Sequence, residues 1–114
     1  MAMKEIDLLQ GTLDLLILKT VSSEPMHGYR IAAKIQELSD EVLRIEEGSL
    51  YPALYRLEQK GVIQSEWGMT DNNRKANFYR LTRKGRTELE SETESWERLS
   101  RAVRRVLRAI EQGA

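Results

Sequence analysis

Residues 48–82 have the sequence GSLYPALYRLEQKGVIQSEWGMTDNNRKANFYRLT, and its hydrophobic pattern changes at Gly61. Before Gly61, apolar residues recur every three or four positions, as on the buried face of a helix. After Gly61 the pattern alternates, and the polar run Thr70–Asn73 is dense in residues that form turns. The stretch therefore predicts a helix followed by a two-stranded hairpin with a polar tip.

The helix is predicted to begin with Ser49 as its N-cap and with Pro52 in its first turn, and to end at Gly61. Its predicted buried stripe is Leu50, Ala53, Leu54 and Leu57. The hairpin strands are predicted at Ser65–Gly68 and Asn77–Leu81, with Arg74 and Lys75 at the tip or just past it.

Two further helices are predicted upstream, over Ile6–Ser22 and over about Gly28–Leu38, with an extended link at Val42–Ile45. Pro25 separates these two helices, because the residue before a proline avoids helical geometry. The apolar faces are Ile6, Leu9, Leu13, Leu16, Ile17 and Val21 in the first helix and Ile31, Ile35 and Leu38 in the second.

The last predicted element is a helix from its N-cap Thr82 to about Ile110, which would be about 43 Å long. Acidic residues dominate its first half and arginines its second half, an order that suits antiparallel pairing with a second copy. The simplest way to bury its apolar seam is a dimer. The seam, which is the predicted dimerisation surface, consists of Leu89, Trp96, Leu99, Val103, Val106 and Ile110.

Composition excludes several classes of protein. The 114 residues are 40% hydrophobic and 32% charged, as expected for one folded domain. With no cysteine and one histidine, the chain has no thiolate metal site, disulfide or histidine relay. Glu46 and Glu47 have no visible partner acid for paired-carboxylate catalysis. We therefore expect no metal, no cofactor and no enzymatic activity.

The longest aliphatic run near the N-terminus, Leu15–Leu18, is far shorter than the roughly 20 residues of a membrane span. The N-terminus also lacks the pattern of a signal peptide. We expect no contact with membranes and a cytoplasmic location. The chain has no net charge, but residues 61–86 carry six basic and two acidic side chains. This basic segment suits a focused anion-binding surface on the hairpin.

Three helices followed by a hairpin is the order of a winged helix-turn-helix domain. We expect a mainly helical fold with a small hairpin, in which residues 1–81 form this domain and residues 82–114 a long dimerisation helix packed with it as one unit. In such a fold the helix from Ser49 enters the major groove of DNA. The hairpin tip, the wing, lies on neighbouring phosphates or in the minor groove.

Several motifs resemble the PadR family of bacterial transcriptional regulators. The single C-terminal helix is similar to that of the short subclass of the family. The resemblance implies a homodimer that binds a palindromic operator in double-stranded DNA, generally as a repressor, and gives His27 a structural role. The motifs, from about Gly11 to Trp96, are His27-Gly28-Tyr29 with Ile31, Gly48–Leu54 with Arg56-Leu57-Glu58 and Gly61, Trp67, Tyr79–Thr82 and Gly85.

The predicted DNA contacts come from three places. At the start of the helix from Ser49, which we call the reading helix because it is expected to enter the major groove, Ser49, Tyr51 and Pro52 are candidates to contact phosphate. One turn further on are Tyr55 and Arg56. Arg56 is a candidate to contact a guanine edge, the alternative being a solvated side chain, since no acid follows three or four residues later.

The other two places are the wing tip and the second helix. Asn72, Asn73, Arg74 and Lys75 at the wing are predicted to contact phosphates, although a charged turn is often only solvated. On the second helix, Arg30 and Lys34 are further candidates for backbone contacts.

Trp96 has two open interpretations. It lies on the apolar seam, where it would be part of a dimer core. The family resemblance also allows an aromatic residue of this helix to line a pocket between subunits for a flat hydrophobic or aromatic effector. For the chain as a whole, the alternative to a DNA-binding regulator is a winged-helix module that binds proteins. An acidic wing and an apolar outer face on the third helix would mark that alternative.

Overall fold

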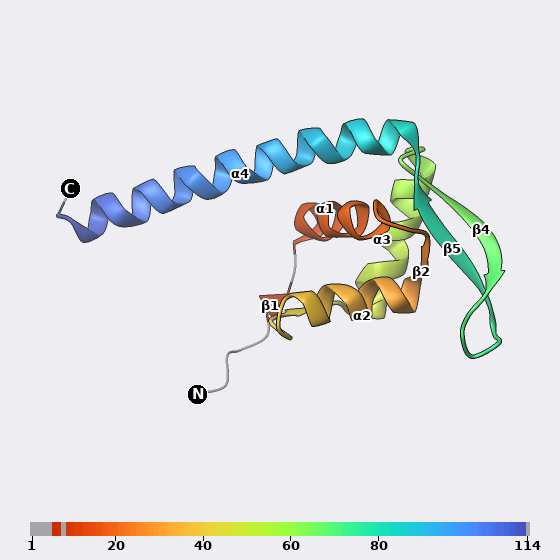
Figure 1. Cartoon of the computed structure of the whole chain (residues 1–114). Helices are drawn as coiled ribbons and strands as arrows, with labels where there is room; N and C mark the ends of the chain where they lie inside the picture. The colour runs from red at the N-terminus through yellow and green to blue at the C-terminus, as the bar shows by residue number, and fades with distance from the viewer. Residues whose placement is uncertain (1–5, 8, 114) are drawn as a thin grey trace.

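The computed structural model describes residues 6–7 and 9–113 and shows three short helices, a projecting hairpin and one long helix (Figure 1). The architecture is mainly helical with a small sheet, as predicted. In chain order the elements are β1 (Ile6–Asp7), α1 (Gln10–Val21), β2 (Met26–His27), α2 (Gly28–Leu38), β3 (Leu43–Arg44), α3 (Glu47–Gln59), β4 (Ile63–Met69), β5 (Lys75–Leu81) and α4 (Arg83–Glu111).

The core lies where α1, α2 and α3 meet the base of the hairpin. Each helix buries residues at the predicted three-and-four spacing, so the sequence-based assignment of the core face is confirmed for these positions. The buried residues are Leu13, Ile17, Leu18 and Val21 of α1, Ile31 and Ile35 of α2, Leu50, Ala53, Leu54 and Leu57 of α3, and Met26, Val62, Ile63 and Leu81 around the sheet.

The sheet has the strand order β2-β5-β4, with both pairs antiparallel. The β4–β5 ladder runs from Ile63 opposite Leu81 to Met69 opposite Lys75. Both strands are longer than predicted, and Lys75 begins β5 just past the turn. The wing is therefore a stiff ribbon up to the residue next to Arg74.

The turn at the wing tip is closed by backbone bonds. The Thr70 N–H donates to the Arg74 carbonyl at 2.8 Å, and the Asn73 N–H donates to the Thr70 carbonyl at 2.9 Å. Asn73 has a φ of 61°, the left-handed conformation that asparagine tolerates better than most residues. The tip predicted from the run of turn-forming residues is confirmed.

The apolar faces predicted for the first two helices include residues that the structure does not bury. Ile6 and Asp7 form β1, which pairs in parallel with Leu43 and Arg44, so α1 begins only at Gln10; Leu8 lies outside the described residues. Leu9 is the N-cap of α1 and is 80% exposed. Leu38 is the last residue of α2 and is 71% exposed. At the end of a helix, an apolar residue can continue the helical spacing at a position that no core faces.

The start of α3 also differs from the prediction. The helix begins at Glu47, and its N-cap is Glu46, whose side chain makes no capping bond. The N–H groups of Ser49 and Leu50 both donate to the Glu46 carbonyl, which places Ser49 inside the first turn. Pro52 therefore lies in the second turn. A cap without a side-chain bond leaves no pattern in the sequence, whereas Ser49 matched the usual one.

Helix α4 begins where it was predicted to begin. The Thr82 side chain accepts a bond from the Gly85 N–H at 3.0 Å, and 29 helical residues follow. The first turns of α4 lie along α1, and the rest extends beyond the domain (Figure 1). None of the described helices combines the length and apolar character needed to cross a membrane.

Gly85 is the one buried residue of α4, and its backbone lies directly against Val62. A Cβ atom at Gly85 would stand 2.0 Å from the Val62 carbonyl oxygen. We expect Gly85→Ala to destabilise the fold by about 1–3 kcal/mol, although alanine favours helices, because the backbones must separate. Urea unfolding at matched protein concentration measures this. The control is Gly11→Ala in α1, where the added Cβ meets nothing within 4 Å; equal stability of the two variants would contradict the expectation.

Candidate nucleic-acid interface

Helix α3 buries one face and exposes the other. The exposed face carries Glu47, Tyr51, Tyr55 and Gln59 at intervals of four residues, with Gly48, Ser49 and Pro52 beside them. None of the exposed side chains between Glu47 and Gln59 is basic. The outer surface of this helix therefore combines aromatic rings and polar groups without a cation.

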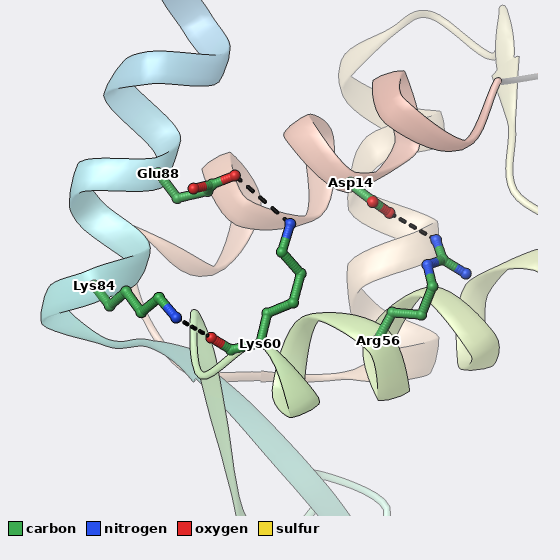
Figure 2. A network of polar contacts seen from close by, with 5 residues as sticks. All are labelled: Asp14, Arg56, Lys60, Lys84 and Glu88. Carbon is green, nitrogen blue, oxygen red and sulfur yellow. Dashed lines mark hydrogen bonds and ion pairs between the residues drawn. The ribbon is translucent and has the colours of Figure 1, made fainter.

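Arg56 is a basic residue of α3, but its side chain points toward α1 and not outward from the exposed face. Its Nη2 atom donates to Asp14 Oδ1 at 3.0 Å, and both side chains are partly buried (Figure 2). Asp14 is 42 residues away in sequence, so the absence of an acid three or four residues after Arg56 does not leave this side chain without a partner. Arg56 thus fastens α3 to α1 in the structure.

The surroundings of Asp14 raise the pKa of its carboxyl group. Burial raises the pKa of Asp14 above its usual 3.8, and the neighbouring Arg56 and Lys60 side chains only partly offset the effect of burial. Because the folded state binds the proton more tightly, the contribution of Asp14 to stability decreases as the pH rises from 3.8 through the folded-state pKa.

Removing Arg56 tests this balance. We expect Arg56→Met to raise the pKa of Asp14 further, because the charge and hydrogen bond that favour the carboxylate are lost. An NMR titration of the Asp14 carboxyl measures the change, with Lys19→Met on the exposed side of α1 as the control. A pKa that stays the same or falls in the Arg56 variant would contradict the assigned role of the ion pair.

The tip of the wing is exposed and mostly basic or amide in character. Asn72, Asn73, Arg74 and Lys75 all lie on its surface. The Lys75 Nζ atom stands 5.3 Å from the centre of the Trp67 ring, a cation–π contact that orients the lysine. The strand register places Trp67 and Lys75 on the same face of the wing as Asn77 and Tyr79.

A cleft of about 730 Å³ lies between this face of the wing, the start of α2 and Tyr51 of α3. We call it the wing cleft. The Tyr51 ring closes one side by packing on Gly28, where a Cβ atom would be 3.0 Å from a ring carbon. The cleft contains three cationic side chains against one carboxylate. Its lining is His27–Arg30, Tyr51, Trp67, Thr70–Asn72, Arg74–Asn77 and Tyr79.

The wing cleft brings together part of the predicted site. Tyr51, Asn72, Arg74 and Lys75 line it, and so does Arg30 of α2. The other predicted contacts do not line it: Ser49, Pro52 and Tyr55 lie on the open face of α3, Asn73 on the wing tip, Lys34 further along α2, and Arg56 against Asp14.

Two large, exposed aromatic residues that line the cleft, Tyr29 and Trp67, were not predicted as site residues. Tyr29 and Trp67 are 74% and 63% exposed, which is unusual for large aromatic side chains in a small domain. Trp67 lies opposite Asn77 in the strand register, so the side-chain period of two places it on the same face as Asn77 and Tyr79, which line the cleft. Tyr29 follows the start of α2 and has no comparable signal in the sequence.

The predicted seam of α4 is largely exposed in the single chain. Its residues from Trp96 to Ile110 are between 46% and 65% exposed. Leu107 is 61% exposed, lies one turn after Val103, and widens the seam beyond the predicted set. Leu89, by contrast, packs against the core of the same chain. The free part of the seam therefore begins near Trp96.

Three helices, a short strand before α2 and a projecting two-stranded wing define a winged helix-turn-helix protein. Residues 17–91 match the family described as the transcriptional regulator PadR-like family. The chain belongs to this family, whose members are transcriptional regulators and not enzymes.

Individual relatives agree with this assignment. A transcriptional regulator of Mycobacterium tuberculosis is 38% identical over 87 residues, which are 76% of this chain and 78% of that protein. The structure of a transcriptional regulator from Clostridium thermocellum is similar with a TM-score of 0.77 and 30% identity, covering 84% of this chain and 93% of that one. For a PadR-like regulator from Bacillus cereus the TM-score is 0.74 and the identity 30%, covering 87% and 94%.

Proposed function

We propose that this transcriptional regulator binds a palindromic operator in double-stranded DNA as a homodimer and acts as a repressor by occupying it. The observation that carries the proposal is the wing cleft, which joins the start of α2, Tyr51 of α3 and the basic wing in one concave, positively charged surface. A phosphate backbone running between the major and minor grooves has the charge and shape for such a cleft. In this arrangement α3 lies in the major groove.

The exposed face of α3 suggests how bases are read. With no cation on this face, the bidentate contact of arginine or lysine with guanine is not available from α3. Tyr51, Pro52 and Tyr55 offer apolar contacts for thymine methyl groups, and Gln59 offers an amide for adenine. We propose that α3 reads bases through these groups and that Arg56 has a structural role instead.

Phosphate contacts are assigned mainly to the wing and to the start of α2. Arg74 and Lys75 supply charge at the wing, Asn72 supplies an amide, and Arg30 supplies charge from the opposite wall of the cleft. Ser49 and Asn73 are exposed and remain proposed phosphate contacts outside the cleft. Lys34 also remains proposed, but it does not line the cleft.

The dimer is proposed to form through residues 82–114. The 29-residue helix α4 exposes an apolar seam from Trp96 to Ile110, and exposed apolar surfaces of this kind mark protein interfaces. The order of charges along α4 favours antiparallel pairing, with acidic residues of one copy beside arginines of the other. Such a dimer presents two α3 helices about one DNA turn apart.

Trp96 is assigned to the dimer core in this proposal, rather than to an effector pocket. We expect Trp96→Ala to weaken dimerisation by at least about thirtyfold, because large aromatic anchors dominate interface energies. In a Trp67→Phe background, which leaves Trp96 as the single tryptophan, acridine should not quench the tryptophan fluorescence saturably. Saturable quenching would instead support a pocket for flat aromatic effectors between the subunits.

One observation favours a second candidate function, a module that binds proteins. The exposed aromatic rings of Tyr51 and Tyr55 give the outer face of α3 an apolar character. The wing of such a module would be acidic, whereas here Arg74 and Lys75 outnumber Asp71 at the tip.

Selection of binding sites from random duplex DNA separates the two functions. For a dimeric DNA-binding regulator we expect enrichment of an inverted repeat whose half-sites are about one DNA turn apart. The purified full-length chain is used, with its folding checked by circular dichroism. Failure of the folded protein to enrich any sequence at low salt would favour the protein-binding module.

A further inference from the structure

We infer that the contact between the end of α3 and the start of α4 positions the reading helix and thereby sets the half-site spacing that the dimer accepts. This contact, the α3–α4 joint, consists of Lys60–Val62 and Thr82–Glu88. The inference rests on the proposed function, since spacing has a meaning only for a dimer on two half-sites. The positioning residues assigned by the structure are Thr82, Lys84 and Glu88.

Thr82 connects the two helices directly. Its N–H donates to the Val62 carbonyl at 3.1 Å, and its hydroxyl donates to the Gly61 carbonyl at 2.7 Å. The same hydroxyl oxygen accepts from the Gly85 N–H at 3.0 Å as the N-cap of α4. One side chain thus holds the turn that ends α3 and the first turn of α4 at the same time.

Lysine side chains cross the joint in both directions (Figure 2). The Lys84 Nζ atom donates to the carbonyl oxygen of Lys60, the C-cap residue of α3, at 2.7 Å. The Lys60 Nζ atom in turn lies 3.7 Å from Glu88 Oε1, one turn further along α4. The Lys60–Glu88 ion pair is partly exposed and contributes little to folding stability, so variants that remove it should still fold.

The joint has little room to move. Gly61 has a φ of 77°, which lets the chain turn sharply after α3. Gly85 brings the α4 backbone into direct contact with the fully buried Val62. On its other side, α3 is fastened to α1 by Arg56 and Asp14, and α1 lies along α4 (Figures 1 and 2). Helices α1, α3 and the first half of α4 therefore form one rigid unit.

A rigid α3–α4 joint limits the half-site spacings that the dimer can bind. Two base pairs added between the half-sites rotate one half-site by about 70° around the DNA axis and shift it by about 7 Å. A dimer held by α4 can follow this change only by bending somewhere between α4 and α3. A rigid joint therefore makes binding strongly dependent on spacing.

The test compares spacer lengths on duplexes built from the half-site that the selection enriches. For the wild-type chain, we expect a two-base-pair change of the spacer to weaken binding about 100-fold, as for the loss of one half-site. The joint variant Lys84→Met with Glu88→Gln should reduce this penalty to about tenfold or less. Its affinity for a duplex with a single half-site should stay within about twofold of the wild type. The matched control is Arg83→Met with Glu90→Gln, two exposed residues of α4 whose side chains make no hydrogen bond or ion pair in the described part of the chain; it should keep the full penalty.

A charge exchange provides a second test. Lys60→Glu alone should relax the spacing preference, and adding Glu88→Lys should restore it. An unchanged spacer penalty in the joint variants, or an equal loss of affinity on all duplexes including the single half-site, would overturn the inference and leave the proposed function intact. Absence of any enriched repeat from the folded protein would overturn both.

Discussion

A glutamate at the centre of the α4 seam is expected to convert the protein into a monomer that no longer binds its operator. Val103 is 48% exposed in the single chain and lies between Leu99 and Leu107 on the seam. In a two-fold dimer, Val103→Glu places two carboxylates in an apolar interface, where burying an unpaired charge is costly. We expect the dimer dissociation constant to rise by at least about 100-fold, as for the loss of a hot spot.

Sedimentation equilibrium over a range of concentrations measures this effect, and gel shifts on the selected duplex measure its consequence for DNA binding. Arg101→Glu is the control, since Arg101 lies on the opposite face of α4. The control variant should remain a dimer. If the Val103 variant still dimerised and still bound both half-sites, the proposal that the dimer forms through α4 would be wrong.

The second large effect is expected at the wing. Replacing Arg74 and Lys75 with glutamine removes two of the three cations of the wing cleft. Each lost phosphate contact should reduce the slope of log K against log salt by about 0.9, and a dimer with two wings loses four such contacts, so the slope should fall by about 3.6. The affinity should fall on the order of 100-fold at 50 mM salt and by less at higher salt.

The loss should be similar on the selected operator and on unrelated duplex DNA, because phosphate contacts carry no sequence information. Lys19→Gln with Arg83→Gln removes two exposed charges that do not line the cleft, and it serves as the control. An unchanged slope in the wing variant would exclude Arg74 and Lys75 as phosphate contacts.

The sequence predicted most of the fold because local patterns decide most of it. The spacing of Leu50, Leu54 and Leu57 leaves only one face for α3 to bury, and Thr70–Asn73 leaves only one place for the hairpin to turn. Helix ends were less predictable. Glu46 caps α3 without a side-chain bond, and Leu9 and Leu38 continue the apolar spacing past the point where a core exists.

The sequence indicated individual residues of the candidate site, but not which of them lie together or what they contact. Arg56 has no acidic partner within its own helix, and the partner that holds it, Asp14, becomes a neighbour only when α1 packs on α3. The wing cleft likewise joins Tyr29, Tyr51 and Trp67 from three different elements. Such contacts depend on tertiary packing, which the local period of hydrophobic residues does not encode.

Hydroxyl-radical footprinting of the wild-type chain on the selected duplex tests the central claim most directly. A homodimer that reads DNA with α3 and the wing should protect two symmetric patches on one side of the duplex, centred about one DNA turn apart. Each patch should include the phosphates that flank a major-groove half-site. A single asymmetric patch, or uniform cleavage at concentrations where the protein is a folded dimer, would contradict the account.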